Sequence, residues 1–244
     1  MNITRSRILF LISGLLIVLF AGCSVNQNIR MTDEFGAEGP MEIELSDELL
    51  AYLLDLSGVL GEQEQDVSPF DLEQLAVLMD EEPGLELLDA EIPAQQRLTM
   101  RVAAEDIERV FTEGPHRVEG LVTAERQGRE HTVTIELDRT RMQQITSLSP
   151  VAEESAVEFL LPPERMDTDE YVEYLAWAME EYEQETPIEE VIRDAVVELR
   201  VEVPGTLLSV DGGEADGNTA VFAEGAARLL TVRETTRWSV TWRR

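Results

Sequence analysis

The sequence contains no lysine and only one cysteine, and both absences limit what the protein can be. Because Cys23 has no partner in the chain, no intramolecular disulfide can form, and stability must come from packing. All 19 basic residues are arginines, against 50 Asp and Glu, and the formal net charge is −31. Such a charge repels nucleic acid phosphates and anionic headgroups, so we expect no nucleic acid partner. A high-salt habitat and GC-rich codon usage would both explain an acidic, lysine-free chain.

Motifs for catalysis and for metal binding are also missing. The two histidines, His116 and His131, lie in or beside expected strands, without the spacing of an HExxH site or of a triad. Residues 211–218 are acidic and glycine-rich, but an EF-hand register puts Gly212 and Ala223 where carboxylates are needed. We therefore expect a turn there, no metal, no cofactor and no enzymatic activity.

The first 22 residues have the order of an export signal. Arg5 and Arg7 precede an apolar run at residues 8–20, and small residues then lead to Cys23. An uncleaved anchor helix is the alternative, but the run is shorter than the ~20 residues of a bilayer span. The ending resembles the lipobox of bacterial lipoproteins, with Phe20 at the usual Leu position. The resemblance implies cleavage before Cys23 and attachment of acyl chains such as palmitate to this residue, with Ser24 favouring the outer membrane.

The remaining chain is expected to form one extracytoplasmic domain at residues 41–244, after a stretch at 23–40 that holds the acylated cysteine, a short tether and a first strand. Period-two alternation predicts strands at 25–31, 41–45, 84–92, 97–103, 117–124, 131–137, 196–203, 206–210, 218–222 and 235–242. Helical spacing and capping residues predict helices that begin near Ser46, Ser68, Ala104, Val151, Asp167 and Thr186, with a capping box formed by Asp167 and Glu170. This mixed order predicts an α+β fold, a mostly antiparallel β-sheet with helices packed on one face.

Four aromatic residues gather on the helix expected after Asp167. Tyr171, Tyr174, Trp177 and Tyr182 flank its apolar stripe, so much of its circumference is apolar or aromatic. One interpretation is a core helix packed on two sides. The other is an exposed aromatic strip that binds a partner or an acyl chain. These four residues are the candidate ligand-binding site.

The C-terminal part resembles LppM-type bacterial membrane lipoproteins. The similar segments are Val201-Glu-Val-Pro-Gly205, Val210-Asp-Gly-Gly213, residues 216–222 and Trp238-Ser-Val-Thr-Trp242. This chain has Gly212-Gly213 where the family often has Asn-Gly, and Phe222 where it often has Trp. The resemblance implies an exported, membrane-tethered domain with a role in envelope maintenance or in handling lipid.

Three hypotheses follow for the function. The first is a lipid-anchored, non-enzymatic envelope domain that binds a lipid or another apolar ligand in a cleft between sheet and helices. The second is a structural or assembly lipoprotein that contacts another envelope protein. The third, a carboxylate-dependent hydrolase, has no motif behind it, because acidic pairs such as Glu180-Glu181 arise anywhere in so acidic a chain.

Overall fold

The computed structural model describes residues 22–32, 34–59, 69–113, 117–147, 161–162 and 166–244. These residues form an α+β fold, as the sequence predicts, with the strands divided between two sheets. The strands are β1 (Cys23–Met31), β2 (Ala37–Leu45), β3 (Leu85–Ala94), β4 (Arg97–Ala104), β5 (Val122–Gln127), β6 (Glu130–Leu137), β7 (Val196–Glu202), β8 (Thr206–Asp211), β9 (Glu214–Asp216), β10 (Thr219–Gly225) and β11 (Thr236–Arg243). The helices are α2 (Asp47–Val59), α3 (Leu72–Glu81), α4 (Ile107–Thr112), α5 (Arg139–Ser147), α6 (Thr168–Ala178), α7 (Ile188–Asp194) and α8 (Ala226–Leu230), with a 3₁₀ turn at Glu180–Tyr182.

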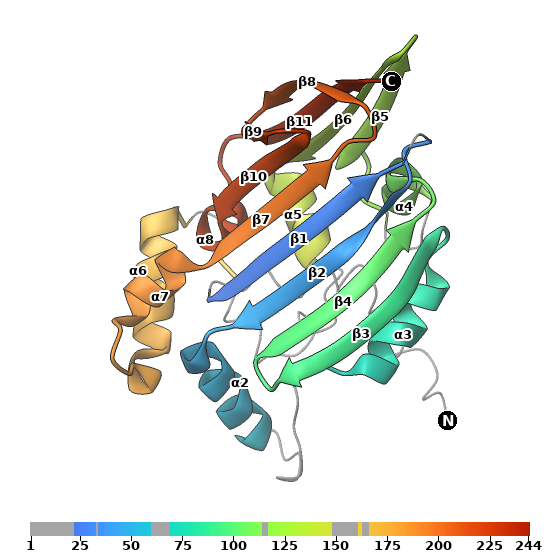
Figure 1. Cartoon of the computed structure of the whole chain (residues 1–244). Helices are drawn as coiled ribbons and strands as arrows, with labels where there is room; N and C mark the ends of the chain where they lie inside the picture. Colours follow the sequence, from blue (N-terminus) through green and yellow to red (C-terminus); the bar gives the residue numbers. More distant parts are fainter. Residues whose placement is uncertain (1–21, 33, 60–68, 114–116, 148–160, 163–165) are drawn as a thin grey trace.

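The larger sheet has seven strands in the order β3-β4-β2-β1-β7-β10-β9, and the smaller has four in the order β5-β6-β11-β8. Every pairing is antiparallel except β1 with β7, where Val25 lies beside Val197. In Figure 1 the seven-stranded sheet lies across the front, with α4, α5 and the four-stranded sheet behind it. One face of the larger sheet therefore carries the core, and the other faces solvent.

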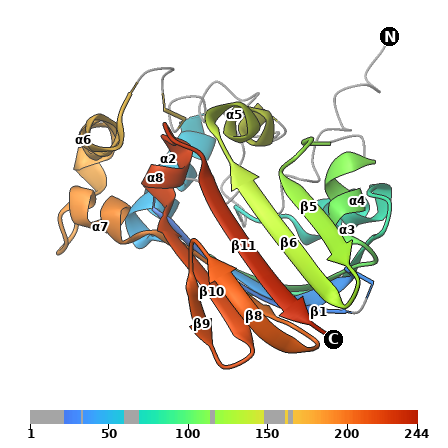
Figure 2. The same ribbon diagram turned by 90° about the horizontal axis from the view of Figure 1, so that it is seen from above.

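The two sheets meet at the strands β8 and β9, which the turn at Gly212 and Gly213 joins. Above this turn Phe222 of β10 stacks on Trp238 of β11, with ring centroids 5.5 Å apart. A Cβ on Gly213 would lie 2.4 Å from the Phe222 ring, so only glycine allows this close approach. Figure 2 shows α3 and α4 beside β5, on the side of the smaller sheet away from β8. The sheets are thus joined at one edge and flanked by helices at the other.

Strand alternation decides which residues enter the core. In β1 the buried or half-buried Cys23, Val25, Gln27, Ile29 and Met31 share the inner face. The outer face of the larger sheet carries arginine–carboxylate pairs between neighbouring residues and strands: Arg30–Glu202, Arg97–Glu44, Arg101–Glu38 and Arg200–Asp216. Each pair is exposed enough to contribute at most about 1 kcal/mol. Together they explain where many of the arginines lie.

Polar side chains cap several helices at their N-termini, and the start of the second helix differs from the expected one. Ser46 Oγ accepts a hydrogen bond from the Leu49 amide at 3.1 Å before α2, and Asp167 forms the expected capping box with Glu170 before α6. The second helix begins after Asp71, whose carboxylate accepts from the Gln74 amide at 3.0 Å, and not at Ser68. Pro187 is the N-cap of α7, with no side-chain cap bond.

Other boundaries also differ from the sequence prediction. β1 begins at Cys23 itself, so the residues expected as a tether belong to the sheet. The hairpin of β5 and β6 turns at Gly128-Arg129, because β5 extends through Gln127, beyond the expected strand end at Ala124. The helix expected at residues 151–161 lies almost wholly outside the described residues. α5, α8 and β9 were not predicted, because α5 is mostly polar and the other two have only five and three residues.

We predict that Gly39→Ala strongly destabilises the fold. Gly39 sits in β2 against β1, and a Cβ there would lie 1.7 Å from the carbonyl oxygen of Asn28. The two strands would have to move apart, which we expect to lower the free energy of unfolding by about 3 kcal/mol or more. Gly225→Ala is the control, because its Cβ would meet nothing within 4 Å. Chemical denaturation should show a change below about 1 kcal/mol for this variant; equal effects of the two would contradict the packing described here.

Candidate functional site

An apolar cavity of about 240 Å³ lies between the two sheets. The inner faces of both sheets line it, together with residues of α3, α4, α5 and α8. Ligand pockets for drug-sized molecules start near 300 Å³, whereas an apolar cavity of about 150 Å³ is enough to bind benzene. Scaling from that case, the cavity suits a molecule of about ten non-hydrogen atoms.

The walls of the cavity come from alternating positions on strands. Met41 of β2 lies next to Gln27 of β1, and Leu199 of β7 lies on the other side of Gln27. All three line the cavity. Val122 of β5 pairs with Ile135 of β6 across the cavity wall on the smaller sheet. The alternation that the sequence shows therefore builds both walls, one from each sheet.

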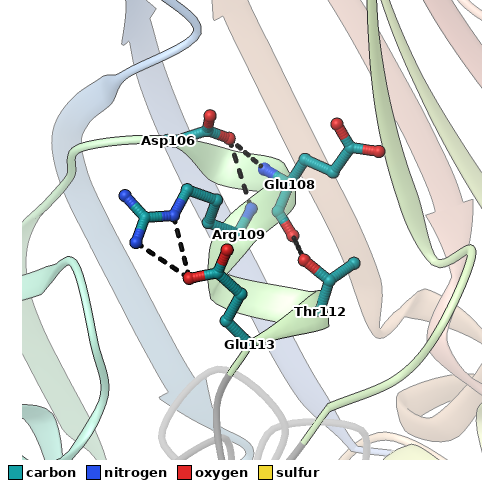
Figure 3. A network of polar contacts seen from close by, with 5 residues as sticks. All are labelled: Asp106, Glu108, Arg109, Thr112 and Glu113. Atoms are coloured by element: carbon teal, nitrogen blue, oxygen red, sulfur yellow. Dashed lines mark hydrogen bonds and ion pairs between the residues drawn. The ribbon is translucent and has the colours of Figure 1, made fainter.

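Helix α4 closes part of the cavity with Ile107, Val110 and Phe111. Polar contacts fix this helix from its outer side (Figure 3). Asp106 accepts hydrogen bonds from the Glu108 and Arg109 amides, at 2.9 and 3.2 Å, and the Thr112 hydroxyl donates to the Glu108 carbonyl at 3.0 Å. The helix thus has a polar face held by its own side chains and an apolar face turned to the cavity.

One ion pair on α4 also shifts pKa values at its surface. The Arg109 guanidinium donates two hydrogen bonds to Glu113, at 3.0 and 2.8 Å. These bonds lower the pKa of the Glu113 carboxyl and raise the pKa of Arg109. Both groups are exposed, so the pair orders the end of the helix more than it stabilises the fold.

Three polar residues line the cavity among those the structure describes: Gln27, Glu38 and Glu198. The two glutamates alternate with inward residues, and they pair with Arg101 and Arg200 on the outer face of the sheet. Their carboxylates therefore turn to solvent. Gln27 belongs to the inner row of β1, so its amide is the hydrogen-bonding group on the cavity side. No arginine or histidine is found among the described lining residues.

The four aromatic candidates lie together near α2 and α6, away from the cavity lining. Tyr171 is fully buried, while Trp177 is 71% exposed and its ring centroid lies 6.5 Å from that of Tyr174. Tyr182 donates a hydrogen bond to Asp55 at 2.7 Å and packs edge-on against Tyr52. Tyr171 therefore belongs to the core, whereas Trp177 lies on the surface.

Cys23 is fully buried at the start of β1, opposite Leu45. It lies close enough to Tyr171 to oppose ionisation of that phenol. The segment before it is fixed at its end, because the Gly22 carbonyl accepts a hydrogen bond from the Ser46 amide at 2.8 Å. The thiol therefore belongs to the core in this structure.

The histidines and acidic groups bring together no metal site in the described part of the chain. His131 is buried and stacks on Trp242, with ring centroids 5.4 Å apart, while Phe35 packs against both rings. His116 lies outside the described residues. No helix within those ranges has the length and apolarity needed to span a membrane.

A second hollow, of about 690 Å³, lies among Thr32, Glu34, Glu105, Asp106, Arg109 and Arg244. Its walls are polar and carry both signs of charge. Asp106 already caps α4 and Arg109 already pairs with Glu113. These two groups are occupied within the protein, so the apolar cavity is the stronger candidate for a binding site.

The sequence predicted an apolar cleft between sheet and helices and most of the strands that line the cavity, but it named none of the lining residues as a site. Alternation shows that Met41, Met100 and Val133 face a core, but it cannot show that two sheets enclose space. The available signal was Gln27, a polar residue in an otherwise apolar inner row of β1. Once the pairing of β1 with its neighbouring strands is known, the position of Gln27 places a polar side chain beside apolar core residues.

The raised pKa values of two tyrosines, the buried Tyr171 and the half-buried Tyr182, lead to a prediction about alkaline pH. Burial raises the pKa of Tyr171, and burial followed by the hydrogen bond to Asp55 raises the pKa of Tyr182. Because the pKa is raised in the folded chain, the unfolded chain ionises first, above its usual tyrosine pKa of about 10. The free energy of unfolding is therefore fully retained below about pH 10 and falls as the pH rises above it. We expect at least two of the four tyrosines to ionise only on unfolding, measured by tyrosinate absorbance. Reversible ionisation of all four tyrosines near pH 10 in the folded chain would contradict this expectation. Tyr171→Phe should weaken the fall of the free energy of unfolding with rising pH.

Comparisons with known proteins give one structural likeness. No protein-family model matches the chain, and no curated protein sequence matches it significantly. The NMR structure of the folded domain of LppM from Mycobacterium tuberculosis is similar, with a TM-score of 0.40 and 12% identity over 91% of this chain and 90% of that domain. A likeness this distant assigns neither a family nor a ligand.

Proposed function

We propose that the chain is a non-enzymatic binding domain that holds one small apolar molecule between its two sheets. The apolar cavity of about 240 Å³ is the observation that carries this proposal. A cavity lined by aliphatic side chains gains free energy when an apolar molecule leaves water and enters it. The cavity suits a single short hydrocarbon chain or a small ring system, not a two-chain lipid.

The remaining surface favours this proposal over a structural docking role. Four large apolar side chains are exposed on the described surface: Val77, Leu88, Trp177 and Leu208. They lie on four different elements, α3, β3, α6 and β8. An interface core would need several such residues side by side. Trp177 remains the candidate for a secondary contact, together with Tyr174 beside it.

We further propose that the domain is an envelope lipoprotein anchored through acyl chains on Cys23. The support is the signal-like segment at residues 1–22, and Ser24 after the cysteine favours the outer membrane. Because the Cys23 thiol is buried, an attached glyceride would require Cys23 to leave its place opposite Leu45. The strand would then begin at Ser24 or Val25, and the domain would lie close against the membrane.

Naphthalene, with ten carbon atoms, tests the binding proposal. We expect the purified full-length chain to bind one molecule with a Kd on the order of 10 to 100 µM by calorimetry. Val102→Phe and Val122→Phe place a ring in the cavity from opposite sheets, and each should weaken binding at least about tenfold if the ring occupies the ligand's space. Leu208→Phe adds the same ring at an exposed site and should leave binding unchanged. Absence of binding to a folded wild-type chain would contradict the proposal, as would an affinity equal to that of the wild type in both cavity variants.

The anchor has a separate test in a bacterium that processes lipoproteins. We expect the wild-type chain to enter the detergent phase on phase partitioning, because acyl chains add about 0.8 kcal/mol of membrane affinity per buried methylene. Cys23→Ser should stay in the aqueous phase. Leu45→Ala is the control for loss of packing at the same strand end, and it should partition like the wild type. A wild-type chain found in the aqueous phase with a free Cys23 thiol would overturn the anchor.

A further inference from the structure

Gln27 is the polar feature of the cavity that the apolar-binding proposal does not use. Its neighbours on the inner face of the sheet, Met41 and Leu199, are both buried and apolar. No hydrogen bond joins its side chain to another described residue. Gln27 is half-buried, and an amide beside apolar side chains loses part of its hydration without a hydrogen bond in return.

The amide can both donate and accept a hydrogen bond, which narrows the ligand class. Glu38 and Glu198 turn their carboxylates outward to Arg101 and Arg200, and the described lining contains no cation. An anionic headgroup in the cavity would lose its hydration and find no opposite charge. A hydroxyl, ester or amide group would lose less, because one hydrogen bond to Gln27 offsets much of its desolvation.

We propose that Gln27 binds the polar group of an uncharged amphiphile, a molecule with one short hydrocarbon chain and one neutral hydrogen-bonding group. This inference rests on the proposed function and adds the chemistry of the ligand's polar end. The hydrocarbon part lies against the aliphatic walls of both sheets, and the hydroxyl or carbonyl group lies at β1. The cavity volume limits the chain to about eight to ten carbons.

The test compares 1-octanol with octanoate, which share a chain length and differ in charge at the polar end. At neutral pH we expect the full-length chain to bind 1-octanol at least about tenfold more tightly than octanoate. Gln27→Leu should weaken 1-octanol binding about fivefold, the size of one lost hydrogen bond, and should leave naphthalene binding unchanged or tighter. Gln27→Met, which keeps the shape of the side chain, should behave in the same way.

The control variant is Asn26→Leu, which removes an amide from the exposed face of the same strand. It should leave all three affinities unchanged. If naphthalene binds but Gln27→Leu leaves 1-octanol binding unchanged, or if octanoate binds as tightly as 1-octanol, the role of Gln27 is overturned and the proposed function stands. If neither naphthalene nor 1-octanol binds the folded chain, both proposals fail.

Discussion

The stack of Phe222 on Trp238 holds the two sheets together at their shared edge. Each ring belongs to a different sheet, and both side chains are almost fully buried. The turn that joins the sheets passes directly over the stack, where Gly213 approaches the Phe222 ring. No disulfide is available to do this work, because the chain has a single cysteine. Aromatic packing at this junction therefore sets how the sheets face each other.

The cavity follows from this arrangement. Sheets joined at one edge leave space between their inner faces, and helices pack into that space from the other sides. Side chains of α4 and α5, such as Phe111 and Met142, fill part of it and leave about 240 Å³. Cavities in well-packed proteins cost stability, and the outer ion pairs of the larger sheet, such as Arg30–Glu202, add little. The proposed binding role therefore rests on this apolar space and on the one inward amide at Gln27.

The sequence predicted most of the secondary structure but not the site. Alternation located β4, β6 and β7 closely, and the Asp167 capping box was confirmed, because both signals are local. The division into two sheets depends on long-range contacts such as Phe222 on Trp238, which no local pattern shows. Tyr171 shows the same limit: its spacing placed it on the apolar side of a helix, but could not separate core packing from ligand contact. Cys23 was expected at the start of a short tether and lies in a strand.

Methionine methyl groups offer the most direct test of the cavity account, because they report contacts at single side chains. Met41, Met79, Met100 and Met142 line the cavity, whereas Met31 and Met179 are buried elsewhere. With methyl-labelled methionine, NMR spectra of the folded full-length chain should show the first four signals shifting as naphthalene is added and the last two staying in place. Unchanged signals for the four lining methionines would contradict the central claim that the space between the sheets is the binding site.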